Sequence, residues 1–422
     1  YDERSQLTGM ETVLKDGRIL HKASYSYDNA GNRITRDEQY TSLQMRHDTT
    51  CYTYDSMERL TKESLNGAVT SYGYDLAGNR ITKSTDGRTE KYFYNNRNQL
   101  TELHREKDVV RYSYDPAGNL TEENYLTADG ASTKKLHYAY DVYNRNVSVT
   151  GDDFTQKNHY DAEGYRDSIT EKDKVTNFVY QGGMLLHELD EDKNPARHYV
   201  LGNEYIGLDH NYYLTDEQGS VRYVLDAAGN VQNDYRYDAF GQRIAGQENI
   251  PNRLRYNAQI EDDLTGLYYL RARYYNTGIG RFTQEDVIYN DGLNLYEYCS
   301  SNPVMYADPS GYAGGSVKQK TCGSKDCGNT TNKYQKASLW ERLTNRKAKA
   351  NDLHANPLDD ISNPKVGPSE SAVAKYMKEI NTTGKLSESI EVQKLSTGGY
   401  EIVNGHHKWL AAKKVGLKKV PI

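Results

Sequence analysis

The chain has 422 residues, with 53 Lys and Arg against 59 Asp and Glu and a formal net charge of −6 at pH 7. This length exceeds one ordinary domain, and no apolar run reaches the ~18 residues that a membrane-spanning helix needs, which excludes a helical membrane span. Residues 313–422 hold 19 Lys and Arg against 10 Asp and Glu, which leaves 34 against 49 for residues 1–312. A basic tail after an acidic body indicates that the tail binds an anion such as nucleic acid or nucleotide, or that it packs against the acidic body.

A phrase that begins with Tyr-Asp recurs along the first part of the chain. Its best-preserved copies are YDNAGNRIT (27–35), YDLAGNRIT (74–82) and YDPAGNLT (114–121). One set of tyrosines repeats at intervals of 20 residues: Tyr54, Tyr74, Tyr94 and Tyr114. Alternating residues around each phrase predict strands, and its Ala-Gly-Asn step predicts a turn. Because one hairpin cannot bury a face alone but stacked copies can, the period predicts a long curved sheet, with packed tyrosines and turn-capping aspartates.

These phrases resemble the Rhs/YD-repeat family over nearly all of residues 1–312. The resemblance is most specific in YYLTDEQGSVRYVLDAAGNV (212–231) and YRYDAFGQRI (235–244), and the stretch 256–312 looks like the Rhs-associated core module. It implies a mainly β fold, in which residues 1–240 form an antiparallel β-shell built as a spiral of hairpins. The core module is expected at 241–312, and the family's shell encloses the C-terminal segment.

The resemblance also implies a self-cleavage site. In the family, aspartates at the positions of Asp286 and Asp308 cut the chain just after a DPxGL motif, which here reads DPSGY, so the expected cleavage bond is Tyr312–Ala313. The chemistry needs two close carboxyl groups, one ionised to draw a proton from water and one protonated to polarise the peptide carbonyl. Tyr312 replaces the usual Leu, and Val287 follows the first aspartate where Pro is common. The alternative is structural, with Asp308 as a turn residue and Asp286 as a strand-end cap.

The composition changes after residue 312, where tyrosine nearly vanishes and glycines cluster, which indicates a domain boundary. Residues 313–365 are predicted to be a linker, with a weak amphipathic helix at 337–350. From residue 366 the pattern predicts a small α+β domain in the order helix, strand, strand, helix, strand. The helices are expected at 369–380 and 408–415, and the strands at 389–393, 400–403 and 419–422.

The sequence YEIVNGHHKWLAAKKVGLKKVPI at 400–422 resembles the ParB/sulfiredoxin-like superfamily in its toxin and nuclease-like branch, and the match covers residues 366–422. His406 and His407 are the candidate catalytic residues. The candidate binding residues are Asn404, Gly405 and Lys408. A helix start with unpaired N–H groups binds phosphate readily, and histidine can transfer protons near neutral pH. Lys408 replaces the usual Arg and offers a point charge instead of a planar fork. The alternative is an inert module in which the histidines are a surface pair.

Together these features predict a fragment of a polymorphic toxin for interbacterial competition, whose shell releases a nuclease-like effector after aspartyl self-cleavage. The resemblance implies a nucleic acid or nucleotide target, a cognate immunity protein and secretion machinery as partners. It also implies a secreted or cell-surface protein whose effector acts in the target-cell cytoplasm. Two other functions stay open: a nucleotide-binding or nucleotide-hydrolysing C-terminal enzyme, and a non-enzymatic YD-repeat surface protein. The sequence identifies no metal ligands, and a divalent metal stays open as a cofactor of the effector.

Overall fold

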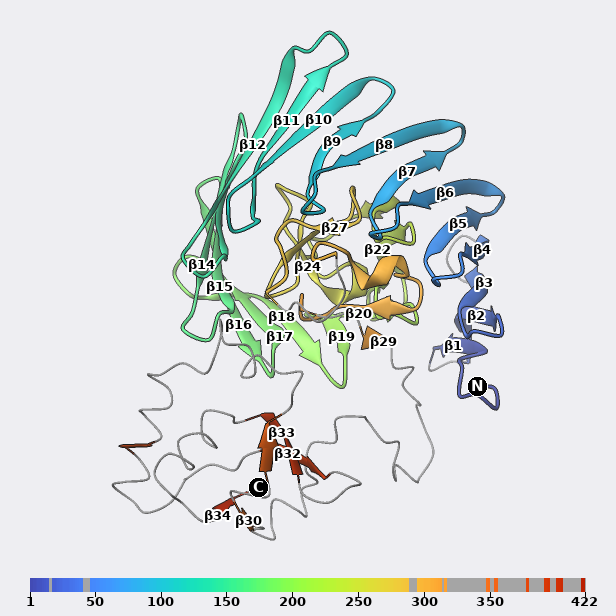
Figure 1. The fold of residues 1–422 in the computed structure, drawn as a ribbon. Coiled ribbons are helices and arrows are strands. Elements are labelled where there is room, and N and C mark those ends of the chain that lie inside the picture. The colour runs from blue at the N-terminus through green and yellow to red at the C-terminus, as the bar shows by residue number, and fades with distance from the viewer. Residues whose placement is uncertain are drawn as a thin grey trace. The chain divides into compact units, whose positions relative to one another are not determined.

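The computed structural model describes residues 1–14, 17–40, 46–287 and 294–312, and shorter pieces at 315–316, 347–349, 353–355, 377–378, 391–394, 400–404 and 419–421. The chain divides into two compact units, residues 1–320 and residues 321–422. Antiparallel strands dominate the first unit (Figure 1), which confirms the predicted mainly β fold.

The shell is one sheet of 23 strands in which each strand pairs antiparallel with the next along the chain. Its strands are β1 (Gly9–Val13), β2 (Ile19–Tyr27), β3 (Arg33–Tyr40), β4 (Arg46–Tyr54), β5 (Leu60–Leu65), β6 (Ala68–Tyr74), β7 (Arg80–Thr85), β8 (Arg88–Tyr94), β9 (Leu100–His104), β10 (Asp108–Tyr114), β11 (Leu120–Thr127), β12 (Ser132–Tyr140), β13 (Asn146–Thr150), β14 (Thr155–Tyr160), β15 (Arg166–Glu171), β16 (Lys174–Gln181), β17 (Met184–Leu189), β18 (Pro195–Leu201), β19 (Tyr205–Leu208), β20 (Asn211–Thr215), β21 (Val221–Leu225), β22 (Val231–Tyr237) and β23 (Arg243–Glu248).

The Tyr-Asp phrases lie where the strand pairing becomes irregular. The pairing register shifts immediately before the tyrosine at Tyr54, Tyr74, Tyr94 and Tyr114. A β-bulge bends its strand and increases the local twist. Bulges that recur at this spacing therefore account for the curvature of the sheet that Figure 1 shows.

The aspartate of each phrase holds the turn that follows it. Asp75 Oδ1 accepts hydrogen bonds from the backbone N–H groups of Ala77 at 2.9 Å and Asn79 at 2.8 Å. The Asn79 side chain donates to Asp75 Oδ2 at 2.9 Å. Gly78 takes the left-handed conformation, with a φ of 81°. Asn79 contributes to the turn through its side-chain hydrogen bond. The prediction that aspartates cap the turns is confirmed.

The tyrosine of each phrase packs its ring and directs its hydroxyl to the backbone of an earlier strand. Tyr74 Oη donates to the Leu60 carbonyl at 2.7 Å, and Tyr94 Oη donates to the Arg80 carbonyl at 2.8 Å. A ring that satisfies its hydroxyl in this way can be buried at little cost. The prediction that the tyrosines pack is also confirmed.

A module at residues 250–312 lies within the curve of the shell (Figure 1, yellow to orange). Four short strands form its sheet: β24 (Ile260–Glu261), β25 (Tyr268–Tyr269), β26 (Tyr274–Asn276) and β27 (Arg281–Phe282). Two 3₁₀ turns are η1 (Tyr256–Ala258) and η2 (Cys299–Ser301). The module ends on β28 (Tyr306–Ala307), which pairs antiparallel with β29 (Gly315–Ser316).

The module contacts the Tyr-Asp turns one after another. We call the six turns at 28–32, 55–59, 75–79, 95–99, 115–119 and 141–145 the turn row. Six module side chains bond to it: Asn302 to Asn32 and Glu58, Asn294 to Ala77 and Asn79, Arg281 to Asn79 and Asn98, Glu285 to Arg97, Tyr296 to Gly118, and Gln284 to Asn144. Each turn of the turn row therefore places a polar group against the module.

The opposite ends of the hairpins are closed by short exposed turns. Asn66-Gly67 joins β5 to β6 and Asp86-Gly87 joins β7 to β8, with positive φ at all four residues. Two consecutive left-handed residues define the turn type that matches the twist of a hairpin.

The second unit contains the strands β30 (Lys347–Lys349), β31 (Leu353–Ala355), β32 (Glu391–Lys394), β33 (Tyr400–Asn404) and β34 (Lys419–Pro421). Antiparallel β32 and β33 confirm the predicted hairpin, β31 joins β33 in parallel, and β34 pairs with β30. The prediction of a helix at 337–350 is wrong at its end, because Lys347–Lys349 form the strand β30. Pairing with β34 overrides the weak helical pattern there. Of the expected helix at 369–380 only residues 377–378 are described, and they are helical. The expected helix at 408–415 lies outside the described residues.

Candidate cleavage site and buried charge cluster

Asp286 and Asp308 approach one another around a single arginine. Asp286 follows β27, Asp308 follows β28, and both side chains are buried. Arg273 Nη2 lies 2.7 Å from Asp286 Oδ2 and 3.8 Å from Asp308 Oδ2. The two carboxyl groups predicted to form the cleavage pair therefore share one cation, whose charge offsets their mutual repulsion.

The rest of Arg273 is fixed by the backbone of the same region. Its Nε donates to the Gly311 carbonyl and its Nη1 donates to the Leu295 carbonyl at 3.0 Å. The guanidinium carbon also lies 3.6 Å from the centroid of the Phe282 ring. Arg273 thus contacts both the carboxyl pair and the segment that precedes the expected cleavage bond.

The Asp308 carboxylate shapes the loop that carries this bond. Its Oδ1 accepts hydrogen bonds from the Ser310 backbone N–H at 3.1 Å, the Ser310 hydroxyl at 3.0 Å and the Gly311 N–H at 2.8 Å. Tyr312 at the end of the loop is 44% exposed. Asp308 is therefore a turn-forming residue, as the structural alternative expected, and also a member of the carboxyl pair.

Gly311 is required where the loop lies against residues 270–273. Its φ is 75°, and a Cβ atom there would lie 2.6 Å from the Leu270 carbonyl oxygen and 2.9 Å from the Arg273 nitrogen. The Ala272 N–H donates to the Ser310 carbonyl at 3.2 Å. Only a residue without a side chain allows the loop to come this close.

Arg271 and Arg273 were missed from the sequence. Arg271 Nη1 donates to the Pro309 carbonyl at 3.0 Å, and its Nη2 donates to the Gly183 carbonyl at 2.8 Å. The available signal was two arginines in an otherwise tyrosine-rich segment, LYYLRARYY at 267–275. A cation in such a segment needs a partner when it is buried, and the nearby carboxylates supply one.

The candidate residues of the effector lie almost entirely outside the described residues. The stretch Gly405–Lys408, which includes both histidines, is among these, and Ala313 of the expected cleavage bond also lies outside the described residues. Asn404 is the last residue of β33, and its backbone pairs with Glu391 of β32.

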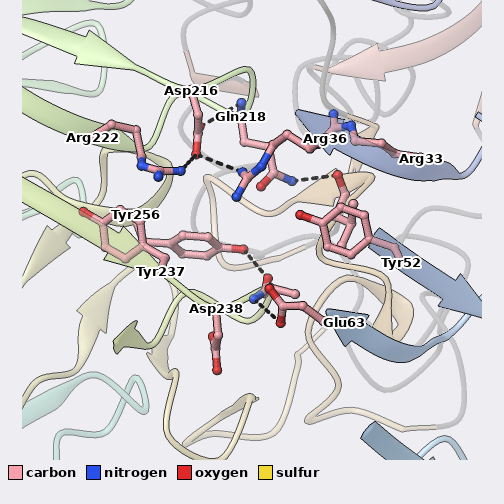
Figure 2. A pocket seen from close by; sticks show the side chains of 12 residues that line it. Arg33, Arg36, Tyr52, Glu63, Asp216, Gln218, Arg222, Tyr237, Asp238 and Tyr256 are labelled. Carbon is pink, nitrogen blue, oxygen red and sulfur yellow. Dashed lines mark hydrogen bonds and ion pairs between the residues drawn. The ribbon is translucent and has the colours of Figure 1, made fainter. Parts of the chain in front are cut away.

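A second cluster of charges is buried inside the shell, around a cavity of about 20 Å³ (Figure 2). Arg33 and Arg36 come from β3, Arg222 comes from β21, and Asp216 lies in the turn before β21. Figure 2 shows Arg36 and Arg222 approaching Asp216 from opposite sides, and each has a nitrogen 4.0 Å from an Asp216 oxygen. Such a volume holds about one water molecule, so the cavity offers no room for a larger ligand. The charges around it join early strands of the shell to late ones.

Burial and neighbouring charge shift several pKa values in this cluster. Burial and then the neighbouring Glu217 raise the pKa of Asp216 to about 6. Burial and then Asp238 raise the pKa of Glu63 to about 7. Burial opposes the ionisation of Glu38, but Arg222 and Arg36 outweigh it and hold the pKa of Glu38 well below its usual range. Two of the buried carboxyl groups therefore titrate close to neutral pH.

Two findings concern the described residues alone. Among them, no set of three or more His, Cys, Asp or Glu side chains is arranged to hold a metal ion. In that part of the chain, no helix has the length and apolar character to cross a membrane.

The repeated hairpins, the packed tyrosines and the module within the curve of the sheet define a YD-repeat shell protein. The chain belongs to the Teneurin YD-shell family, whose model matches residues 1–304. A second model, the ParB N-terminal domain, matches residues 342–422. Both resemblances inferred from the sequence are thereby confirmed.

Individual proteins match shorter parts. The chain is 34% identical over 205 residues to a tRNA nuclease, WapA, of Bacillus subtilis (strain 168), covering 44% of this chain and 9% of that protein. It is 38% identical over 109 residues to double-stranded DNA deaminase toxin A of Burkholderia cenocepacia (strain H111), covering 24% of this chain and 8% of that protein. A crystal structure of TcdB2-TccC3-Cdc42 aligns at 17% identity and a TM-score of 0.36, covering 72% of this chain and 21% of that one. The chain thus spans less than a tenth of either curated relative.

Proposed function

We propose that the chain is part of a polymorphic toxin in which a YD shell precedes a nuclease-like effector. One observation carries this proposal: a Teneurin YD-shell match at 1–304 and a ParB N-terminal domain match at 342–422 occur on one chain. Two of its relatives, a tRNA nuclease and a DNA deaminase toxin, support the toxin class. The proposed effector is the domain predicted at 366–422 together with β30 and β31, which lie in the segment predicted as a linker (313–365) and pair with β34 and β33.

We further propose that Asp286 and Asp308 hydrolyse the Tyr312–Ala313 bond. One carboxylate of the pair accepts a proton from water. The water oxygen adds to the Tyr312 carbonyl carbon while the other carboxyl group, which is protonated, donates a hydrogen bond to the carbonyl oxygen. The C–N bond then breaks as the first carboxyl group passes the proton that it took from water to the nitrogen, and the products are a Tyr312 carboxyl group and an Ala313 amine.

A denaturing gel of the full chain tests this step. We expect two fragments for the unmodified chain and one intact band for Asp286→Asn and Asp308→Asn. The exact mass of the N-terminal fragment identifies the bond, because Arg273 contacts the Gly311 carbonyl and a product ending at Gly311 would move the site by one residue. A single band that is the same in the unmodified chain and in Asp308→Asn would refute self-cleavage.

The proposed effector acts on a phosphate-containing target. The support is the ParB N-terminal domain match, together with the basic balance of residues 313–422. Cationic side chains favour phosphate backbones, and such binding weakens as salt concentration rises. His406 and His407 are the proposed catalytic residues, with Asn404, Gly405 and Lys408 holding phosphate.

Inducible expression in bacteria tests the effector, with the full chain and residues 313–422 compared. We expect growth arrest with degraded RNA or DNA, lost in His406→Ala or His407→Ala and kept in the matched control Lys385→Ala. Arrest with intact nucleic acid and depleted nucleotides would instead indicate a nucleotide-hydrolysing enzyme. Unchanged growth with a soluble protein would favour a non-enzymatic surface protein.

The same proposal gives the chain its partners and location. A toxin of this class needs secretion machinery to leave its cell, and an immunity protein protects the producer. We propose secretion or surface display, followed by action of the effector in the cytoplasm of a target cell. Rescue of growth by a small protein encoded beside the toxin would identify the immunity partner.

A further inference from the structure

Arg271 lies between the loop at 308–312, which we call the cleavage loop, and a distant hairpin of the shell. One guanidinium nitrogen donates to the Pro309 carbonyl at 3.0 Å, inside the loop that Asp308 shapes. The other terminal nitrogen donates to the Gly183 carbonyl at 2.8 Å, which is 88 residues away along the chain. A planar guanidinium offers this fork in a fixed geometry, which a lysine ammonium does not.

The hairpin end of this link is a tight turn that lies close to its neighbour. Gly182 and Gly183 form the two-residue turn between β16 and β17, with φ values of 59° and 79°. A Cβ atom on Gly183 would lie 3.3 Å from the Tyr165 hydroxyl oxygen, so the turn fits closely against its neighbour. The Gly183 carbonyl therefore takes this position only when β16 and β17 are paired.

The backbone of Arg271 is held in an unusual conformation. Its φ is 67°, in a region that residues other than Gly and Asn seldom occupy. The neighbouring Ala272 N–H bonds to the Ser310 carbonyl, and the Arg166 N–H bonds to the Tyr269 hydroxyl at 2.9 Å. Contacts on both sides therefore hold the guanidinium between loop and shell.

We propose that Arg271 is a positioning residue that makes self-cleavage depend on the folded β16–β17 hairpin. This rests on the proposed self-cleavage at Tyr312–Ala313. Arg271 does not contact Asp286 or Asp308 among the hydrogen bonds and ion pairs that the structure describes, and acts by fixing the Pro309 carbonyl. Cleavage at Tyr312–Ala313 then occurs only after β16 and β17 have paired. The segment after residue 312 is therefore not released before this part of the shell has folded.

The first experiment measures the rate of cleavage in the full chain after refolding. Arg271→Gly removes both donors and suits the positive φ, and we expect cleavage to slow about 10-fold to 100-fold. Arg271→Lys keeps the charge, and its rate of cleavage should lie between those of the unmodified chain and Arg271→Gly. Millimolar guanidinium should partly restore Arg271→Gly. The control is Arg88→Ala, at a residue with an 82% exposed side chain, which should cleave at the unmodified rate.

The pH profile separates positioning from catalysis. Loss of Arg271 should lower the rate by a similar factor at every pH, because the acid and base are retained. Disappearance of one limb of the profile would instead place Arg271 in the proton transfers and overturn the proposal.

A double-mutant cycle tests the link to the hairpin. Gly183→Ala strains the turn and should slow cleavage when Arg271 is present. It should have little further effect in Arg271→Gly, because the link is already lost. Additive effects of the two substitutions would show that loop and hairpin are uncoupled.

Hydrogen exchange keeps the two proposals distinguishable. In the Asp286→Asn chain, which the proposed mechanism leaves intact, Arg271→Gly should speed exchange at the Ala272 and Gly311 amides. If the unmodified chain never cuts, self-cleavage fails, and exchange alone decides whether Arg271 holds the loop. If the unmodified chain cuts and Arg271→Gly matches it in rate and exchange, the inference about Arg271 is wrong.

Discussion

Glu63 provides a direct test of the buried charge cluster, through the pH dependence of shell stability. Burial and then the nearby Asp238 raise the pKa of its carboxyl group to about 7, while Arg36 and Lys83 oppose the rise. The folded chain therefore binds this proton more tightly than the unfolded chain does. The resulting stability is fully present below about pH 4.5 and is lost as the pH rises to about 7.

The size of the effect follows from that interval. At 1.36 kcal/mol for each tenfold change in proton affinity, the free energy of unfolding falls by about 3 kcal/mol between pH 4.5 and pH 7. Glu63→Gln cannot ionise but still offers an oxygen to the Ala239 N–H, which now bonds to Glu63 at 3.0 Å. We expect the variant to lose this pH dependence and to be more stable than the unmodified chain by up to about 3 kcal/mol at pH 8.

Urea titration between pH 4.5 and pH 8.5 measures these free energies. Tyrosine fluorescence reports on the shell, because 36 of the 39 tyrosines lie within residues 1–312. The control is Glu106→Gln, whose side chain is 68% exposed and which should follow the unmodified profile. Parallel profiles for Glu63→Gln and the unmodified chain would refute the assignment of a near-neutral pKa to this carboxyl group.

Two further substitutions test the module. Gly311→Ala should slow cleavage at least 10-fold, because its Cβ would lie 2.6 Å from the Leu270 carbonyl oxygen. Gly87→Ala has a similar φ and no atom within 4 Å, so it should leave cleavage unchanged on the same gel; equal rates for both would contradict the close fit. Asp262→Asn should lower the free energy of unfolding in urea by about 3–5 kcal/mol, because it leaves the fully buried Arg166 without its carboxylate partner. A loss below about 1 kcal/mol would show that this pair does not hold the module to the shell.

The shell was predictable because its signal is repeated. Tyr54, Tyr74, Tyr94 and Tyr114 set the period, and each turn is held by local contacts such as those between Asp75 and Asn79. Local contacts of this kind are encoded within a few residues. The bulge before each tyrosine was not predicted, because it depends on pairing with the neighbouring strand.

The cleavage pair was named from a resemblance, and its arginines were missed for a physical reason. Arg273 precedes Asp286 by 13 residues and Asp308 by 35, so only the folded module brings the three together. The role of Arg271 is harder still to predict, because its partner in the shell is the backbone carbonyl of Gly183, and every residue has such a carbonyl. Non-local backbone acceptors cannot be deduced from residue spacing.

The turn row restricts how this molecule can vary in size. Asn302, Arg281, Tyr296 and Gln284 meet the turns at fixed steps, so gaining or losing one whole repeat would put every later step out of phase. The exposed ends at Asn66-Gly67 and Asp86-Gly87 carry no such restriction, and a hairpin can lengthen there by adding paired residues. The hairpins of the sheet can therefore lengthen over evolutionary time, while the number of repeats whose turns contact the module stays constant.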